Sequence, residues 1–150
     1  MSHAWSFFFI VLTVSGCTPA APCSTCPSVS GTYAVNWSAD GGGSQQLLDG
    51  GVVACAGGPR PATWTFVTRG SNVTTVIGDT TIGGTLYDTY DLLMTGPGPG
   101  GASYRLRALV IPEGTSTDAG IRLQGTFTTR TVPSSGDPCE SNDAFTALRQ

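Results

Sequence analysis

This 150-residue chain lacks lysine and has almost no histidine. It contains no lysine, so all seven of its basic residues are arginines, and its one histidine is His3. Without a histidine after position 3, the rest of the chain cannot build a Ser-His-Asp or Cys-His nucleophile, use a histidine base or bind a metal through imidazole. The arginines lie singly, with no basic stripe between aromatic residues, which argues against a nucleic-acid partner.

Motifs for metal ions and nucleotides are also missing. There is no D-x-D-x-D-G calcium loop, no glycine-rich phosphate loop after a strand, and no second C-x-x-C that would complete a four-thiolate zinc site. The densest polar cluster is Tyr87-Asp88-Thr89-Tyr90-Asp91. In a strand its two carboxylates fall on opposite faces and cannot act together on one substrate. We therefore expect no metal, no cofactor and no catalytic residues, and we interpret Asp88 as a carboxylate at a rim.

The chain contains five cysteines, at positions 17, 23, 26, 55 and 139. Setting Cys17 aside leaves an even number, which in an exported protein predicts disulfides. Of the three possible connectivities we favour Cys55–Cys139, which closes a long loop and would stabilise the fold by about 2–4 kcal/mol. Cys23 and Cys26 would then pair locally or remain labile. Their C-x-x-C lies between two prolines with no βαβ pattern after it, so we interpret it as structural rather than redox-active.

The N-terminus carries a continuous apolar run over residues 6–14, too short to cross a bilayer and typical of a secretory signal. Val14-Ser15-Gly16-Cys17 follows and resembles the lipobox of bacterial lipoproteins. The resemblance implies cleavage before Cys17, a diacylglycerol thioether on that cysteine and acylation of the new N-terminus. An ordinary signal peptide with a coincidental cysteine is the alternative, because the first five residues contain no Lys or Arg.

The chain therefore divides into a signal peptide at 1–16, a lipidated cysteine with a Pro/Ala/Ser-rich tether at 17–30, and a β domain at 31–150. The resemblance places the protein in the bacterial cell envelope with the membrane as its partner. Thr18 is not the Asp that holds enterobacterial lipoproteins at the inner membrane, which favours the outer membrane. We expect a structural or interaction role there and no enzymatic activity.

Short runs of alternating apolar and polar residues fill the segment 31–150, and none has a helical period. Asp49-Gly50 predicts a hairpin, and Gly83-Gly84 predicts a turn before a single strand over 85–94. We predict an all-β domain, a single small antiparallel barrel or sandwich of about eight short strands. The clearest strands are expected at 31–38, 63–69, 103–111 and 120–131.

Five aromatic residues fall on the presumed inward faces: Trp37, Trp64, Phe66, Tyr104 and Phe127. We interpret them as core, and the alternative is that they line an apolar cavity for a small hydrophobic ligand. Gly31-Thr32-Tyr33 at the start of the domain resembles the Gly-x-Trp start of the lipocalins, with Tyr in place of Trp. The resemblance implies a small barrel that carries a hydrophobic ligand, with Arg149 packed over Tyr33.

Overall fold

The computed structural model describes residues 20–38, 44–46, 52–54, 57–114, 120–131 and 138–150. In these ranges the chain forms strands and a single 3-10 turn, and no helix in them is long and apolar enough to cross a membrane. This confirms the predicted all-β class. The elements are β1 (Gly31–Trp37), β2 (Ser44–Gln46), β3 (Val52–Ala54), β4 (Thr63–Arg69), β5 (Asn72–Ile77), β6 (Thr80–Leu86), β7 (Asp91–Pro97), η1 (Pro99–Gly101), β8 (Ser103–Glu113), β9 (Gly120–Thr131) and β10 (Cys139–Arg149).

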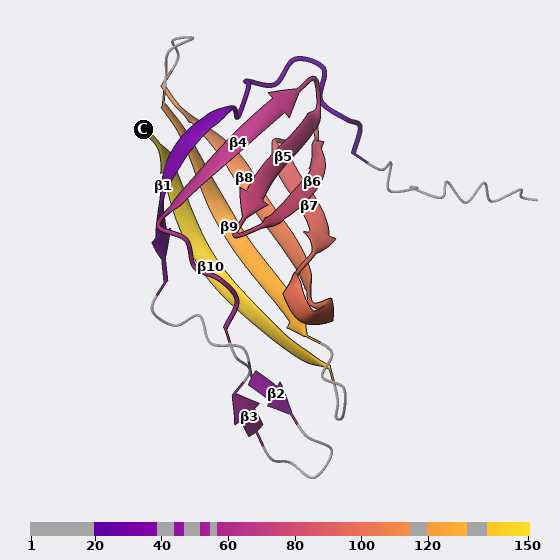
Figure 1. Ribbon diagram of the computed structural model, residues 1–150. Helices are drawn as coiled ribbons and strands as arrows, with labels where there is room; N and C mark the ends of the chain where they lie inside the picture. Colours follow the sequence, from indigo (N-terminus) through magenta and orange to yellow (C-terminus); the bar gives the residue numbers. More distant parts are fainter. Residues whose placement is uncertain (1–19, 39–43, 47–51, 55–56, 115–119, 132–137) are drawn as a thin grey trace, which may run out of the picture.

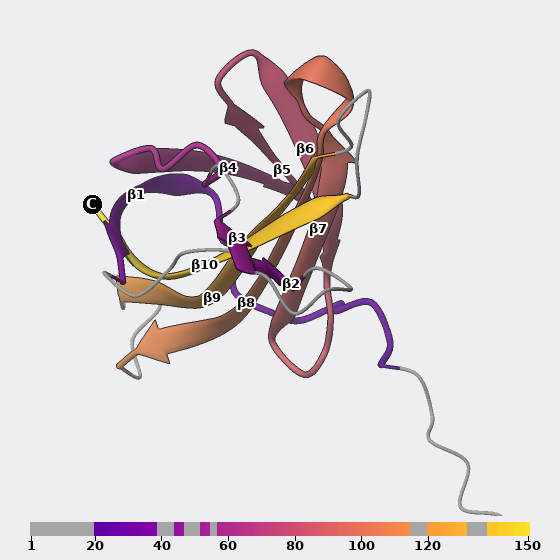
Figure 2. The ribbon, with the colours of Figure 1, turned by 90° about the horizontal axis from the view of Figure 1, so that it is seen from below.

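Eight of these strands close into an antiparallel barrel, which decides between the two architectures that the sequence left open (Figures 1 and 2). From β4 to β10 each strand pairs with the next one along the chain. β1 completes the wall by pairing with β10 on one side and β4 on the other. β2 and β3 form a separate two-stranded sheet, inserted between β1 and β4. Every strand of the barrel has a paired neighbour on each side, which reduces the risk of pairing with another chain.

Alternation along the strands explains why the wall curves around one core. In β4, Trp64 and Phe66 are buried while Thr65 between them is exposed, and β8 repeats the pattern with Tyr104 and Leu106 inside. Successive side chains of a strand point to opposite faces, so one apolar face per strand is enough to fill a closed barrel. The largest fully buried side chains are Trp64, Tyr33, Phe66, Phe127, Phe145, Ile82, Leu86, Leu92, Met94, Leu106, Leu123 and Val29.

The prediction of a single strand over 85–94 is wrong. β6 ends at Leu86 and β7 begins at Asp91, with a tight turn between them. Tyr90 lies in this turn with φ at 63°, and its N–H donates to the carbonyl oxygen of Tyr87 at 2.9 Å. Gly83-Gly84 is not a turn either, since both glycines lie inside β6. A Cβ on Gly84 would lie 1.9 Å from the carbonyl oxygen of Leu93, so close contact with β7 requires this glycine.

Different segments cover the two ends of the barrel. We call the end where β1 begins and β10 finishes the upper end, and the opposite one the lower end (Figure 1). Residues 20–30, the second part of the predicted tether, cross the upper end. Val29 is completely buried there and its carbonyl oxygen accepts a hydrogen bond from Tyr33 Oη at 3.1 Å. The described part of the predicted tether is thus packed against the barrel.

Candidate functional sites

The five aromatic side chains that the sequence placed on inward faces lie together inside the barrel. The ring of Trp64 lies 5.2 Å from that of Trp37, 6.0 Å from Phe66 and 5.8 Å from Phe127, centroid to centroid. Tyr104 joins the group through Phe127, at 5.3 Å. Trp37 is half-buried and the other four are buried. The inward orientation is therefore confirmed, and a ligand-lining role for these residues stays a prediction.

Two further aromatic rings belong to this cluster and were missed. Phe145 on β10 lies 4.8 Å from Trp64, and Tyr33 on β1 lies 5.4 Å from Phe66, both edge to face. Edge-to-face pairs of this kind stabilise by about 0.5–1.5 kcal/mol beyond burial. The signal that could have identified Phe145 is the period of two along β10. Every second residue of this stretch is buried: Ser141, Asp143, Phe145 and Ala147.

A buried charge lies near these aromatic rings at the lower end. Asp143 is only 1% exposed, and its Oδ1 accepts from Nη2 of Arg60 at 2.5 Å while its Oδ2 accepts from Oγ of Ser141 at 3.1 Å. Arg60 belongs to the segment between β3 and β4, which runs in front of β10 in Figure 1. The carbonyl oxygen of Pro61, the next residue, accepts from Nε1 of Trp37 at 3.0 Å. An ion pair and a hydrogen bond therefore hold this segment on the lower end.

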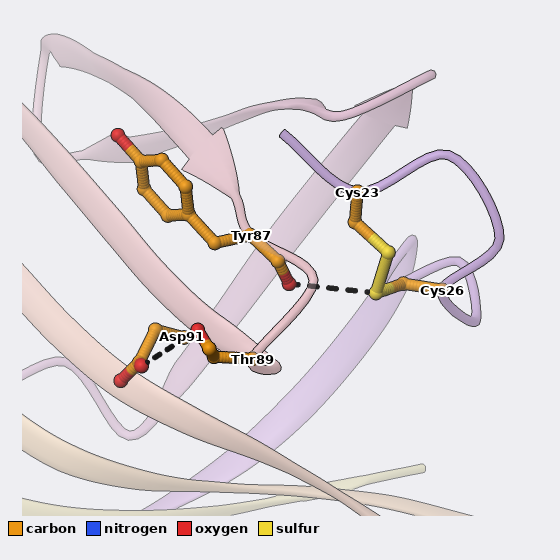
Figure 3. Close-up of a disulfide and its surroundings, with 5 residues drawn as sticks. All are labelled: Cys23, Cys26, Tyr87, Thr89 and Asp91. Carbon is orange, nitrogen blue, oxygen red and sulfur yellow. Dashed lines mark hydrogen bonds between the residues drawn. A yellow bond between two sulfur atoms is a disulfide. The ribbon is translucent and has the colours of Figure 1, made fainter. Parts of the chain in front are cut away.

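A disulfide between Cys23 and Cys26 lies at the upper end (Figure 3). The local pairing expected for these two cysteines is confirmed. Sγ of Cys26 lies 3.5 Å from the carbonyl oxygen of Tyr87, a packing contact, since a disulfide sulfur carries no hydrogen to donate. Cys139 is also disulfide-bonded. Its predicted partner Cys55 and the predicted lipidation site Cys17 lie outside the described residues.

Tyr33 and Arg149 face each other at the upper end. They are register partners in β1 and β10, whereas packing of Arg149 over the ring of Tyr33 stays a prediction. A Cβ on Gly31 would lie 2.8 Å from Nε of Arg149, and Gly31 has φ at 139°, so only glycine fits there. Burial raises the pKa of Tyr33 to about 12, and the positive charge of Arg149 opposes this rise.

A groove of about 490 Å³ lies on the outer surface, and three of its lining residues are drawn beside the disulfide in Figure 3. Leu93 in its wall is 39% exposed, and Arg107 lies directly opposite Leu93 in the register of β7 and β8. Oγ1 of Thr89 donates to Oδ2 of Asp91 at 2.9 Å, as Figure 3 shows. The groove thus combines an apolar wall with one arginine and one carboxylate. Its lining residues are Ala20, Tyr87, Thr89, Asp91, Leu93 and Arg107.

The two carboxylates in the polar cluster at residues 87–91 do not form an acid pair. Asp88 is exposed in the turn between β6 and β7, whereas Asp91 lies half-buried at the start of β7. Among the residues that the structure describes, no group of three or more His, Cys, Asp or Glu side chains is placed to hold a metal ion. No protein-family model, no curated protein and no solved structure matches this chain.

Proposed function

We propose that this chain is a lipoprotein of a bacterial cell envelope, anchored by lipid on Cys17, whose barrel binds a partner rather than catalysing a reaction. The position of Ala20 carries the proposal. This residue lies in the wall of the outer groove and follows Cys17 by three positions. An extended chain spans at most about 3.6 Å per residue, so a lipid on Cys17 would enter the membrane within about 11 Å of Ala20.

The chemistry of the outer groove supports this orientation. Leu93 and Leu109 expose 39% and 45% of their surface, and Arg107 lies between them on the outer face of β8. Exposed apolar side chains next to an arginine suit the boundary between acyl chains and anionic headgroups. The groove would face the membrane, and the lower end of the barrel would point away from it toward a partner. Thr18 after Cys17 favours the outer membrane as the site of anchoring.

Two of the described carboxylates have oxygen atoms engaged by neighbouring side chains, which agrees with binding rather than catalysis. Asp143 is engaged by Arg60 and Ser141, and Asp91 by Thr89. A carboxylate that already holds a cation and a hydroxyl group has little freedom to accept a substrate proton. We therefore assign the barrel an interaction role at the envelope.

The intact mass of the protein purified from membranes tests the anchor. We expect a mass that begins at Cys17 with acyl chains added, and a gain of about four hydrogens on reduction of two disulfides. The matched control Cys17→Ser is expected to leave the membrane fraction. A mass that begins elsewhere, or an unmodified Cys17 in membrane-bound protein, would contradict the proposal.

A carrier of a small hydrophobic ligand is the second candidate function. The closed barrel and the juxtaposition of Tyr33 with Arg149 favour it. Against it, Trp64 and its neighbours fill the interior, whereas a ligand pocket needs about 300 Å³ or more. Titration with a fluorescent apolar probe separates the two: saturable quenching of tryptophan emission at one probe per chain would support the carrier. Probe binding that persists unchanged in Trp64→Phe and Trp37→Phe would place it on the outer surface instead.

A further inference from the structure

Asp143 is the one charged side chain among the buried residues that the structure describes. It is 1% exposed, and its neighbour on the opposite strand is Phe127. A buried carboxylate is tolerated only when a cation and further hydrogen bonds compensate its lost hydration. Here the cation is Arg60, which does not come from the wall but from the segment 57–62, which belongs to no strand. The barrel therefore presents an anionic site, and a separate piece of chain fills it.

Two aromatic residues neighbour Asp143 in the barrel wall, Phe127 on the opposite strand and Phe145 two positions along β10. Phe145 lies on the same face of β10 as Asp143. The indole rings of Trp37 and Trp64 lie 5.7 Å and 4.8 Å from the ring of Phe145, centroid to centroid. Electron-rich ring faces attract organic cations, and they do so more strongly when water is excluded. A carboxylate beside several aromatic rings is thus the chemistry that recognises a guanidinium or an alkylated ammonium group.

Hydrogen-bonding capacity is left unused beside the same site. Oγ1 of Thr129 is buried and has no hydrogen-bond partner among the described residues, and Thr129 is 5% exposed. Thr129 lies directly opposite Ser141, whose hydroxyl group binds Asp143. An unpaired buried polar group costs free energy, and a ligand with a suitable polar group would remove that cost. The hydroxyl group of Thr129 is therefore a second possible point of recognition beside Asp143.

The segment 57–62 covers the site without belonging to the barrel wall. Gly58 packs so closely that a Cβ there would lie 1.9 Å from Oγ1 of Thr129, and Pro61 is held by the indole of Trp37. The side chain of Arg60 remains 38% exposed while its guanidinium reaches Asp143. Exchanging Arg60 for another cation breaks no strand pairing of the barrel.

We propose that the lower end of the barrel is a binding site for a small organic cation of the guanidinium or alkylammonium class, and that Arg60 occupies it in the free protein. The carboxylate of Asp143 pairs with the ligand cation, which takes the place of the Arg60 guanidinium next to Phe127 and Phe145. The ligand competes with a tethered arginine, whose effective concentration is in the millimolar range. Binding to the wild-type chain is therefore weaker than binding to a chain without Arg60. This proposal does not depend on the lipid anchor.

Chemical rescue of Arg60→Ala tests the proposal in the full-length chain. Methylguanidinium chloride is added up to about 50 mM, against sodium chloride at equal ionic strength, and the melting temperature and tryptophan fluorescence are followed. We expect a saturable rise in melting temperature toward the wild-type value. The apparent affinity in the wild-type chain is expected to be at least tenfold lower, and the matched control Arg60→Ala/Asp143→Asn should not respond.

A folded Arg60→Ala chain that gives no saturable response beyond sodium chloride would overturn the proposal, as would an equal response from the double variant. If Arg60→Ala fails to fold, the wild-type chain decides the question by NMR. Methylguanidinium is then expected to shift the indole N–H signals of Trp37 and Trp64 in a saturable manner. Unchanged indole signals up to about 100 mM ligand would overturn the proposal.

Discussion

The two ends of the barrel are closed by opposite kinds of chemistry. At the upper end, Val29 is completely buried and a disulfide joins Cys23 to Cys26, so the cover is apolar and covalently braced. At the lower end the cover is held by the ion pair of Arg60 with Asp143 and a hydrogen bond to Trp37. Small solutes in water cannot replace the first set of contacts, whereas a guanidinium or alkylammonium ion of the proposed class can compete for the second. We therefore expect the lower cover to exchange more readily than the upper one.

The two ends of the barrel also differ in the role that we propose for each, anchoring at the upper end and recognition at the lower end. The upper cover continues toward Cys17 and lies beside the outer groove, where an anchor would attach. The lower cover lies over the aromatic rings and the buried carboxylate. Attachment and recognition would then occupy opposite ends of one barrel, and a change at one end should leave the other intact. Three experiments test that separation.

The largest effect is expected from breaking the lower ion pair on the cationic side. Arg60→Met should reduce the free energy of unfolding by about 3 kcal/mol, because it leaves the buried carboxylate of Asp143 with Ser141 as its partner. Asp143→Asn should cost only about 1 kcal/mol, because Arg60 is 38% exposed and its cation can reach water. Urea denaturation of both variants measures the difference. Equal costs would contradict the role given to the burial of Asp143.

A smaller effect is expected at the upper end in alkali. Burial disfavours the ionised form of Tyr33 and raises its pKa to about 12, so the unfolded chain loses this proton at lower pH than the folded one. The contribution is fully present below pH 10 and is lost as the pH rises toward 12, by about 2–3 kcal/mol in total.

Urea denaturation between pH 9 and pH 12 measures this loss, with Tyr33→Phe as the matched control. The control should lose less stability over the same range, although burial also raises the pKa of Tyr104. Identical pH profiles for the two chains would show that Tyr33 is not the group that titrates.

The smallest effect is expected from removing the disulfide. Cys23→Ser/Cys26→Ser opens a loop of only four residues, for which the chain-entropy model gives about 2 kcal/mol. Hydrogen exchange should accelerate at the backbone amide of position 23, which donates to the carbonyl oxygen of Leu86. The indole N–H signal of Trp37 at the lower end should stay unchanged. A shift of the Trp37 signal in this variant would show that the two ends are coupled.

Most of the barrel wall was predictable because its strands obey a period of two. Trp64 and Phe66 alternate with threonine in β4, and such local patterns fix which side chains face inward. Closure was not predictable, since a sandwich has the same alternation and the choice depends on the pairing of β1 with both β4 and β10. The hairpin at Tyr90 was missed because its turn contains neither glycine nor proline, and a tyrosine adopts the positive φ.

The candidate site was predictable only in its apolar half. Aromatic residues within clear strands could be placed inside from the sequence, as for Trp64 and Phe127. The ion pair could not, because Arg60 and Asp143 are 83 positions apart and Arg60 lies in a proline-rich stretch that predicts only a break in the chain. Contacts between a loop and a distant strand leave no local pattern.

Closure of the wall through β1 and β10 has a consequence for how the protein is made. The first barrel strand can complete its pairing only after the last one exists, since Val35 pairs with Ala147. A chain that emerges in order from a ribosome or an export channel therefore holds β1 with one side unsatisfied until β10 arrives. Such long-range pairing slows folding and exposes strand edges while it is incomplete. Truncation by even one C-terminal strand would leave an open sheet that is prone to aggregate.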